Sequence, residues 1–185
     1  MTAKTTWVID PSHSEIAFKV KHLMISNVKG QFDEFKGQIL TENEDFSTSE
    51  ISFTINPASI NTGTPDRDAH LKSPDFFDVE NFKEITFTSG KLTKSGDDEF
   101  KLSGNLVIKG VSQPVILNVE FGGLMADPWG NVKAGFTIDG RINRKDFGLT
   151  WNAALETGGV LVGDEIKLAL EVQLLKQKVE ELVLA

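Results

Sequence analysis

Cysteine is absent from this chain of 185 residues, and so is tyrosine. Without cysteine the chain has no disulfide framework, no thiol nucleophile, and no zinc or iron–sulfur site held by thiolates. The aromatic residues are 13 Phe and 3 Trp. Since none of these rings carries a hydroxyl group that would bind water, these residues favour burial in an apolar interior.

Basic residues are also few, with 19 Lys and Arg against 27 Asp and Glu and a formal net charge of -8. This balance repels phosphate backbones and anionic head groups, so we expect no nucleic-acid partner. No apolar run reaches the roughly 18 to 20 residues of a membrane span, so we also expect no span. The polar start at Met1–Thr6 resembles no signal peptide, which predicts a cytoplasmic protein.

Signatures of common enzymes are missing from the sequence. No glycines have the G-x-G spacing of dinucleotide-binding and kinase loops, and the phosphate-binding loop, the H-E-x-x-H motif and the G-x-S-x-G motif are absent. The triplet Asp146–Gly148 matches a kinase motif by chance, since no catalytic-loop motif accompanies it. We therefore expect no catalytic residues, no metal site and no cofactor, other than a bound isoprenoid, quinone or fatty-acid-like lipid.

Apolar and polar residues alternate along most of the chain, which is typical of β-strands with one buried face. About eight segments show this pattern: residues 16–20, 28–39, 51–55, 85–87, 100–108, 115–121, 132–142 and 166–174. The alternation slips by one position between Phe32 and Phe35, which indicates a bulge or bend. The separators are short and rich in glycine, proline and aspartate, and they favour antiparallel pairing.

Two segments depart from this rhythm. Residues 64–81 show no alternation, and Thr64 followed by Pro65 is typical of a helix start, so we predict a short helical insertion near residues 65–80. After Leu174, apolar residues recur at helical spacing and predict a C-terminal amphipathic helix that covers the barrel or joins two subunits. We accordingly divide the chain into a domain of residues 1–175 and an amphipathic tail of residues 176–185.

An all-β chain of eight antiparallel strands hides its apolar face either between two stacked sheets or inside one closed barrel. An eight-stranded barrel is filled by its own side chains or holds one small ligand. In the second case, inward-facing apolar side chains form the binding site. The alternation predicts these ligand contacts: Phe18, Val20, Met24, Phe32, Phe53, Ile55, Phe87, Leu106, Leu117, Phe136, Ile138 and Leu168.

Polar candidates are confined to a few residues. The three arginines fall in two loops, where a guanidinium group would either bind the polar head of a lipid, quinone or phosphate ester or form a structural pair with aspartate. The three histidines match no metal-ligand spacing and are either structural or available for proton transfer. The Phe76–Phe77 pair is either a hydrophobic plug or a ligand contact. Our head-group candidates are His22, Arg67, His70 and Arg144.

Seven sequence pieces, in order, resemble the YceI-like family of polyisoprenoid-binding proteins. They are Trp7–Ser14, Val20–Leu23 with Val28–Phe32, Arg67–Asp78 with Ile85–Phe87, Gly110–Val115, Asp127–Gly130, Ile142–Gly148 and Val162–Glu165. The resemblance covers nearly the whole chain. It implies an extended lipocalin-like antiparallel barrel of eight strands with a helical segment, often dimeric, which holds a long isoprenoid chain such as a quinone tail.

These observations favour the binding, storage or transport of a long-chain isoprenoid or similar amphiphile. Burial of a forty-carbon polyprenyl chain would give an affinity of about 1 nM. Two alternatives stay open. One is an enzyme that acts on a lipid or quinone head group through His70 or His22 with Asp68, and the other is a stress-response interaction module whose barrel is packed solid.

Overall fold

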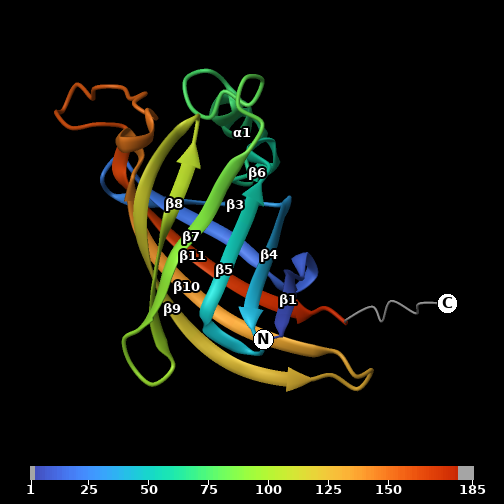
Figure 1. The fold of residues 1–185 in the computed structure, drawn as a ribbon. Helices are drawn as coiled ribbons and strands as arrows, with labels where there is room; N and C mark the ends of the chain where they lie inside the picture. The colour runs from blue at the N-terminus through green and yellow to red at the C-terminus, as the bar shows by residue number, and fades with distance from the viewer. Residues whose placement is uncertain (1–2, 179–185) are drawn as a thin grey trace.

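The computed structural model describes residues 3–178 as one curved sheet that closes on itself, with the helix at one end (Figure 1). All strand pairings in this part of the chain are antiparallel. The strands are β1 (Lys4–Ile9), β2 (Glu15–His22), β3 (Ser26–Phe32), β4 (Phe35–Glu42), β5 (Asp45–Ile55), β6 (Ile60–Asn61), β7 (Ile85–Lys94), β8 (Glu99–Ile108), β9 (Val111–Ala126), β10 (Val132–Asn143) and β11 (Val162–Lys176).

The barrel has eight strands because three of them are interrupted. Strand β11 pairs with β2 through its first part and with β1 through its last, so β1 and β2 form one barrel strand. In the same way β3 and β4 form one strand, and β5 and β6 form another. With β7 to β11, these closed pairings confirm the predicted eight-stranded antiparallel barrel.

The interruptions lie side by side on the three neighbouring strands. The first is a 3-10 turn at Pro11–His13, the third is a 3-10 turn at Pro57–Ser59, and the second is at residues 33–34, where the sequence predicted a bend. Proline has no N–H group to donate to a ladder, so it stands where pairing stops. The backbone N–H of Asp33 donates to the carbonyl of Ser59, which keeps the bend closed.

The two ends of the barrel differ. At the end that carries helix α1 (Pro65–Lys72), β2, β8 and β10 finish and β7, β9 and β11 begin. We call this the α1 end. At the opposite end four aromatic rings pack together, and we call Trp7, Phe46, Phe121 and Phe136 the floor cluster. Their ring centroids lie 4.9 to 5.7 Å apart in contacting pairs.

Trp7 anchors the floor cluster. It is fully buried, and its indole Nε1 donates to the hydroxyl of the buried Thr41 at 3.1 Å, which in turn donates to the carbonyl of Asn43. A buried indole N–H normally needs such a partner. The floor cluster therefore closes this end of the barrel without leaving the indole unpaired.

Helix α1 occupies only the first part of the predicted insertion. It ends at Lys72, and residues 73–84 run in turns held by backbone bonds such as Phe77 N–H to Leu71 carbonyl. Thr64 is the residue before the helix, but its side chain makes no capping hydrogen bond, and Pro65 begins the first turn. In residues 3–178 no helix has the length and hydropathy needed to span a membrane.

The predicted C-terminal helix is not seen. Leu175, its first apolar position, lies in β11 and pairs with Val8 on one side and Lys133 on the other. The strand continues to Lys176, because ladder partners are available on both sides. Residues 177–178 are not helical, and the remainder of the predicted tail helix lies outside the described residues.

Arg144 fixes the loops beside the α1 end. It is 2% exposed, and its guanidinium group donates to the backbone carbonyls of Gly163, Leu149, Trp151 and Val162 at 2.6 to 3.3 Å. Burial lowers the pKa of Arg144, and the carboxylate of Asp164, 3.8 Å away, partly offsets this effect. One buried cation therefore satisfies four carbonyls, two in the irregular segment after β10 and two at the start of β11.

Replacing Arg144 is expected to destabilise the protein. Arg144→Met leaves four carbonyl groups without their donor and should lower the free energy of unfolding by about 3 kcal/mol. Arg144→Lys should retain only part of the lost stability, because an ammonium group cannot reproduce the planar arrangement of N–H donors in a guanidinium group. Urea unfolding followed by circular dichroism measures the free energy of unfolding.

The control Arg141→Met removes an exposed arginine paired with Glu165 and should change the free energy of unfolding by less than about 0.5 kcal/mol. Equal decreases in the free energy of unfolding for Arg144→Met and Arg141→Met would contradict the role of Arg144 in holding these segments in place.

Candidate functional site

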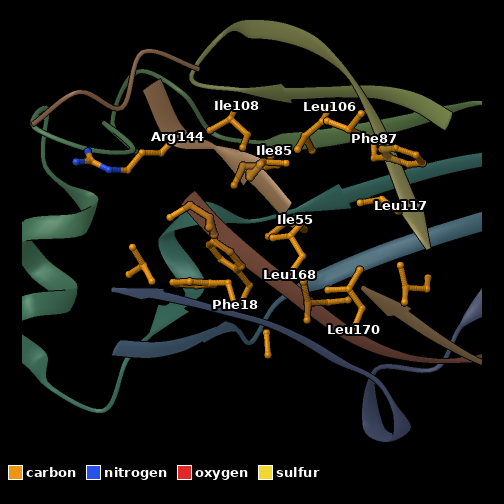
Figure 2. A pocket seen from close by; sticks show the side chains of 18 of the residues that line it. Phe18, Ile55, Ile85, Phe87, Leu106, Ile108, Leu117, Arg144, Leu168 and Leu170 are labelled. Carbon is orange, nitrogen blue, oxygen red and sulfur yellow. The ribbon is translucent and has the colours of Figure 1, made fainter. Parts of the chain in front are cut away.

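A cavity of about 560 Å³ occupies the interior of the barrel. Its wall consists almost entirely of apolar side chains from the strands, and Figure 2 shows these pointing toward one another across an open centre. The volume lies within the range of about 300 to 1,000 Å³ that is typical of small-molecule sites. The barrel is therefore hollow and not packed solid.

Eleven of the twelve predicted apolar contacts line this cavity. They come from all eight barrel strands, so residues distant in the sequence surround one space. These residues are Phe18, Val20, Phe32, Phe53, Ile55, Phe87, Leu106, Leu117, Phe136, Ile138 and Leu168. Alternation located them because one face of each strand is turned inward.

Met24 is the residue that does not line the cavity. It lies in the turn between β2 and β3, with a positive φ of 61° and 57% exposure. The prediction continued the inward series of Phe18, Val20 and His22 by one more step. Because β2 ends at His22 and the chain reverses there, the alternation no longer applies.

Apart from Ser49 of β5, the polar lining residues gather at the α1 end, which we call the mouth. His22 is the last residue of β2, Arg67 and His70 belong to α1, and Arg144 follows β10. Thr62, Asp66 and Lys21 also line this part of the cavity. All four head-group candidates therefore meet at one opening, although their backbones are far apart in the sequence.

Arg67 keeps one side of its guanidinium group available at the mouth. Its Nε donates to the Thr62 hydroxyl at 2.8 Å, and its Nη2 donates to the Thr62 carbonyl at 2.7 Å. The neighbouring Asp68 accepts from the N–H and hydroxyl groups of Thr62. For Nη1 of Arg67, no acceptor is present among residues 3–178, so it is free to bind an oxygen of a ligand.

His70 is held in place by its neighbours. Its Nε2 lies 2.9 Å from a carboxylate oxygen of Asp75, and its ring meets Phe76 and Trp151 edge-on at centroid distances of 5.1 and 4.7 Å. Asp68, which we had considered as its partner, instead binds Thr62. His70 therefore presents a fixed ring to the cavity.

The other candidates contribute less to ligand binding. Arg144 lines the mouth, but its N–H groups already serve backbone carbonyls. His13 is not among the lining residues, and its Nδ1 lies 2.9 Å from Asp10. Hydrogen bonds from Ser12, supported by His13, hold the pKa of Asp10 below its ordinary value. Asp10 and His13 thus stabilise the turn between β1 and β2.

Several lining residues escaped the sequence analysis. Phe46 and Ile51 are five positions apart on β5, so strict alternation would place them on opposite faces of the sheet. Both line the cavity, because the pairing of β4 with β5 shifts register between Leu40 and Glu42. Leu149 and Trp151 come from an irregular segment, where no periodicity exists. Leu149 is held by the carbonyl contact with Arg144, which only the structure reveals.

Metal binding finds little support in the described part of the chain. Residues 3–178 contain no group of three or more His, Asp or Glu side chains placed to hold an ion. The exposed His70–Asp75 pair alone is too few ligands for a structural or catalytic zinc site. The arrangement is instead suited to holding an apolar chain beneath a small polar group.

The chain is similar to known proteins over most of its length. The model of the YceI-like domain matches residues 7–174. The UPF0312 protein SAS2572 of Staphylococcus aureus (strain MSSA476) is 42% identical over 164 residues, which cover 88% of this chain and 93% of that protein.

Solved structures share the fold. The Campylobacter jejuni YCEI protein is 35% identical with a TM-score of 0.73, covering 85% of this chain and 90% of that one. Burkholderia cenocepacia BcnA superposes with a TM-score of 0.77 at 21% identity, over 89% of this chain and 98% of that one.

A polyisoprenoid binding domain from Saccharophagus degradans superposes with a TM-score of 0.65 at 18% identity, over 94% of this chain and 98% of that one. At these low identities the last two show the fold alone. Because the domain match spans most of the barrel and a relative with 42% identity covers it, this chain belongs to the YceI-like family.

Proposed function

We propose that this protein binds a single-chain amphiphile, with its hydrocarbon tail in the barrel and its polar head at the mouth, and that it stores or carries this molecule. The observation that carries the proposal is the apolar cavity of about 560 Å³ whose polar lining residues, apart from Ser49, lie at one end. A long isoprenoid or a related lipid has the matching chemistry. The polyisoprenoid binding domain of the same fold supports this ligand class.

Glycine explains why the cavity stays open although its wall carries many large side chains. An added Cβ at Gly30, Gly37 or Gly140 would lie 2.5 to 2.6 Å from an atom of Phe18, Phe53 or Leu117. Those side chains therefore lie sideways across the glycines, flat against the wall. Phe87 crosses Gly104 in the same way. The large side chains thus supply apolar surface without filling the centre.

The mouth fits an oxygen-rich head group. Arg67 offers Nη1, and His70 is oriented by Asp75, Phe76 and Trp151. An alcohol, a quinone oxygen, a carboxylate or a phosphate would each accept from Nη1 of Arg67. Because residues 3–178 hold no group of three or more His, Asp or Glu side chains placed to bind an ion, and because Asp68 binds Thr62 instead of His70, we favour binding over catalysis.

The alternative of an interaction module required a barrel packed solid, and the hollow interior argues against it. The predicted cytoplasmic location and homodimer stay predictions. An apolar wall discriminates only by length and bulk, at about 1 to 3 kcal/mol for each methylene. Selectivity for a head group therefore rests on the few polar side chains at the mouth.

Extraction of the purified protein is the direct test. Organic extraction followed by mass spectrometry should release close to one equivalent of a single-chain amphiphile, because a cavity of this polarity is unfavourable when filled with water. The stripped protein should then bind geranylgeraniol, measured by calorimetry. An empty extract, together with no uptake of geranylgeraniol by the stripped protein, would refute the proposal.

Narrowing the cavity should weaken binding of the tail. Gly37→Ala places a Cβ against Phe53 and should push that ring inward, which we expect to raise the Kd for geranylgeraniol about tenfold through lost tail contacts. The control is Gly135→Ala, since nothing lies within 4 Å of a Cβ added at Gly135. Calorimetric titration measures both. An unchanged Kd in Gly37→Ala would show that Phe53 does not border the bound tail.

Removing the guanidinium group at the mouth should affect the head group alone. Arg67→Met is expected to weaken binding of geranylgeranyl phosphate about tenfold, as loss of a charge-assisted hydrogen bond predicts. Binding of geranylgeraniol should change less than about twofold, because the tail contacts persist. Arg141→Met serves as the control for net charge. Equal losses for the alcohol and the phosphate would place the effect of Arg67 in the fold and not in head-group recognition.

A further inference from the structure

The cavity is closed at one end by part of the floor cluster. Phe46 and Phe136 line it, whereas Trp7 and Phe121 are not among the lining residues and pack against Phe46 and Phe136. Phe46 lies 4.9 Å from the ring centroid of the buried Trp7 and 5.1 Å from that of Phe136. A tail that enters at the mouth therefore meets a rigid aromatic surface.

The depth above this surface is limited. Phe46 and Ile55 both line the cavity and lie nine residues apart on β5. This spacing corresponds to about 30 Å along a strand, or about 23 Å along the barrel axis at a tilt of about 40°. An extended chain advances about 1.2 Å for each backbone bond, so a straight tail of about 19 carbons reaches the floor cluster.

The volume gives a second estimate of similar size. A water molecule takes about 30 Å³ in the liquid, and a methylene group is comparable in size. The cavity of about 560 Å³ then accommodates roughly twenty such groups when the tail is folded or branched. The forty-carbon chain considered from the sequence is about twice what this space holds.

We propose that Phe46 and Phe136 act as a ruler that selects amphiphiles with tails of up to about 20 carbons over longer polyprenyl chains. This inference rests on the proposed function and adds the chain length that the site accepts. Within the cavity each added methylene gains about fourfold in affinity. Carbons added beyond this length stay in water at the mouth and do not raise the affinity.

The test uses the stripped full-length protein and the series of straight-chain saturated fatty acids from decanoic to tetracosanoic acid, by displacement of cis-parinaric acid. Affinity should rise about fourfold per methylene and then level off at or below about 20 carbons. Phe46→Ala removes most of one ring from the floor and should move this plateau about four to six carbons longer.

Further variants keep the test independent of the folding of Phe46→Ala. Phe46→Leu should move the plateau in the same direction by less. Val172→Phe adds a ring beside Phe136, its cross-strand neighbour, and should move the plateau shorter. The matched control Phe77→Ala removes an equal volume from another part of the lining, where Phe77 packs on Phe32, and should leave the plateau unmoved.

The outcomes separate the two proposals. A plateau that is the same in the wild type, Phe46→Ala, Phe46→Leu and Val172→Phe overturns the ruler while the binding function stands. An affinity of the wild type that still rises up to tetracosanoic acid also overturns the ruler and leaves the binding function standing. A shift in Phe77→Ala equal to that in Phe46→Ala shows that total volume, and not the floor cluster, sets the limit. No binding of any fatty acid or of geranylgeraniol overturns the binding function and the ruler together.

Discussion

The hollow interior depends on large side chains that lie sideways over glycines. Protein interiors are normally close-packed, and an eight-stranded barrel is narrow enough for its own side chains to fill it. Here Phe18, Phe53 and Leu117 each cross a glycine on a neighbouring strand, where any Cβ would collide with them. Their apolar surface therefore covers the wall, while the centre stays open as a cavity of about 560 Å³. Without these glycines the same composition would favour a solid core.

The second constraint is the difference between the two ends. The floor cluster is held by the bond between Trp7 and Thr41, and it gives the cavity an apolar, closed end. At the α1 end, by contrast, Arg144 uses its donors to order loops that have almost no ladder of their own. Arg67 and His70 line the cavity at this same end. An amphiphile therefore has only one orientation in which both its tail and its head find suitable partners.

Much of this was predictable from alternation, and the failures have physical causes. The eight strands, the bend at residues 33–34 and eleven of the lining residues follow from period-two patterns. Phe46 was missed because a register shift reverses the parity of β5, and Met24 was misplaced because a turn ends β2. The C-terminal helix was predicted from spacing alone, whereas Leu175 has ladder partners on both sides. The carbonyl contacts of Arg144 depend on backbone geometry, which no residue pattern encodes.

The orientation of a bound tail tests this account most directly. Intermolecular nuclear Overhauser effects can be recorded between labelled protein and geranylgeraniol, whose two ends have distinct resonances. The account predicts contacts from the terminal methyl groups to the rings of Phe46 and Phe136, and from the hydroxyl-bearing carbon to residues at the mouth such as His70. Contacts of the terminal methyl groups with the mouth, or with side chains on the outer wall such as Ile116, would contradict it.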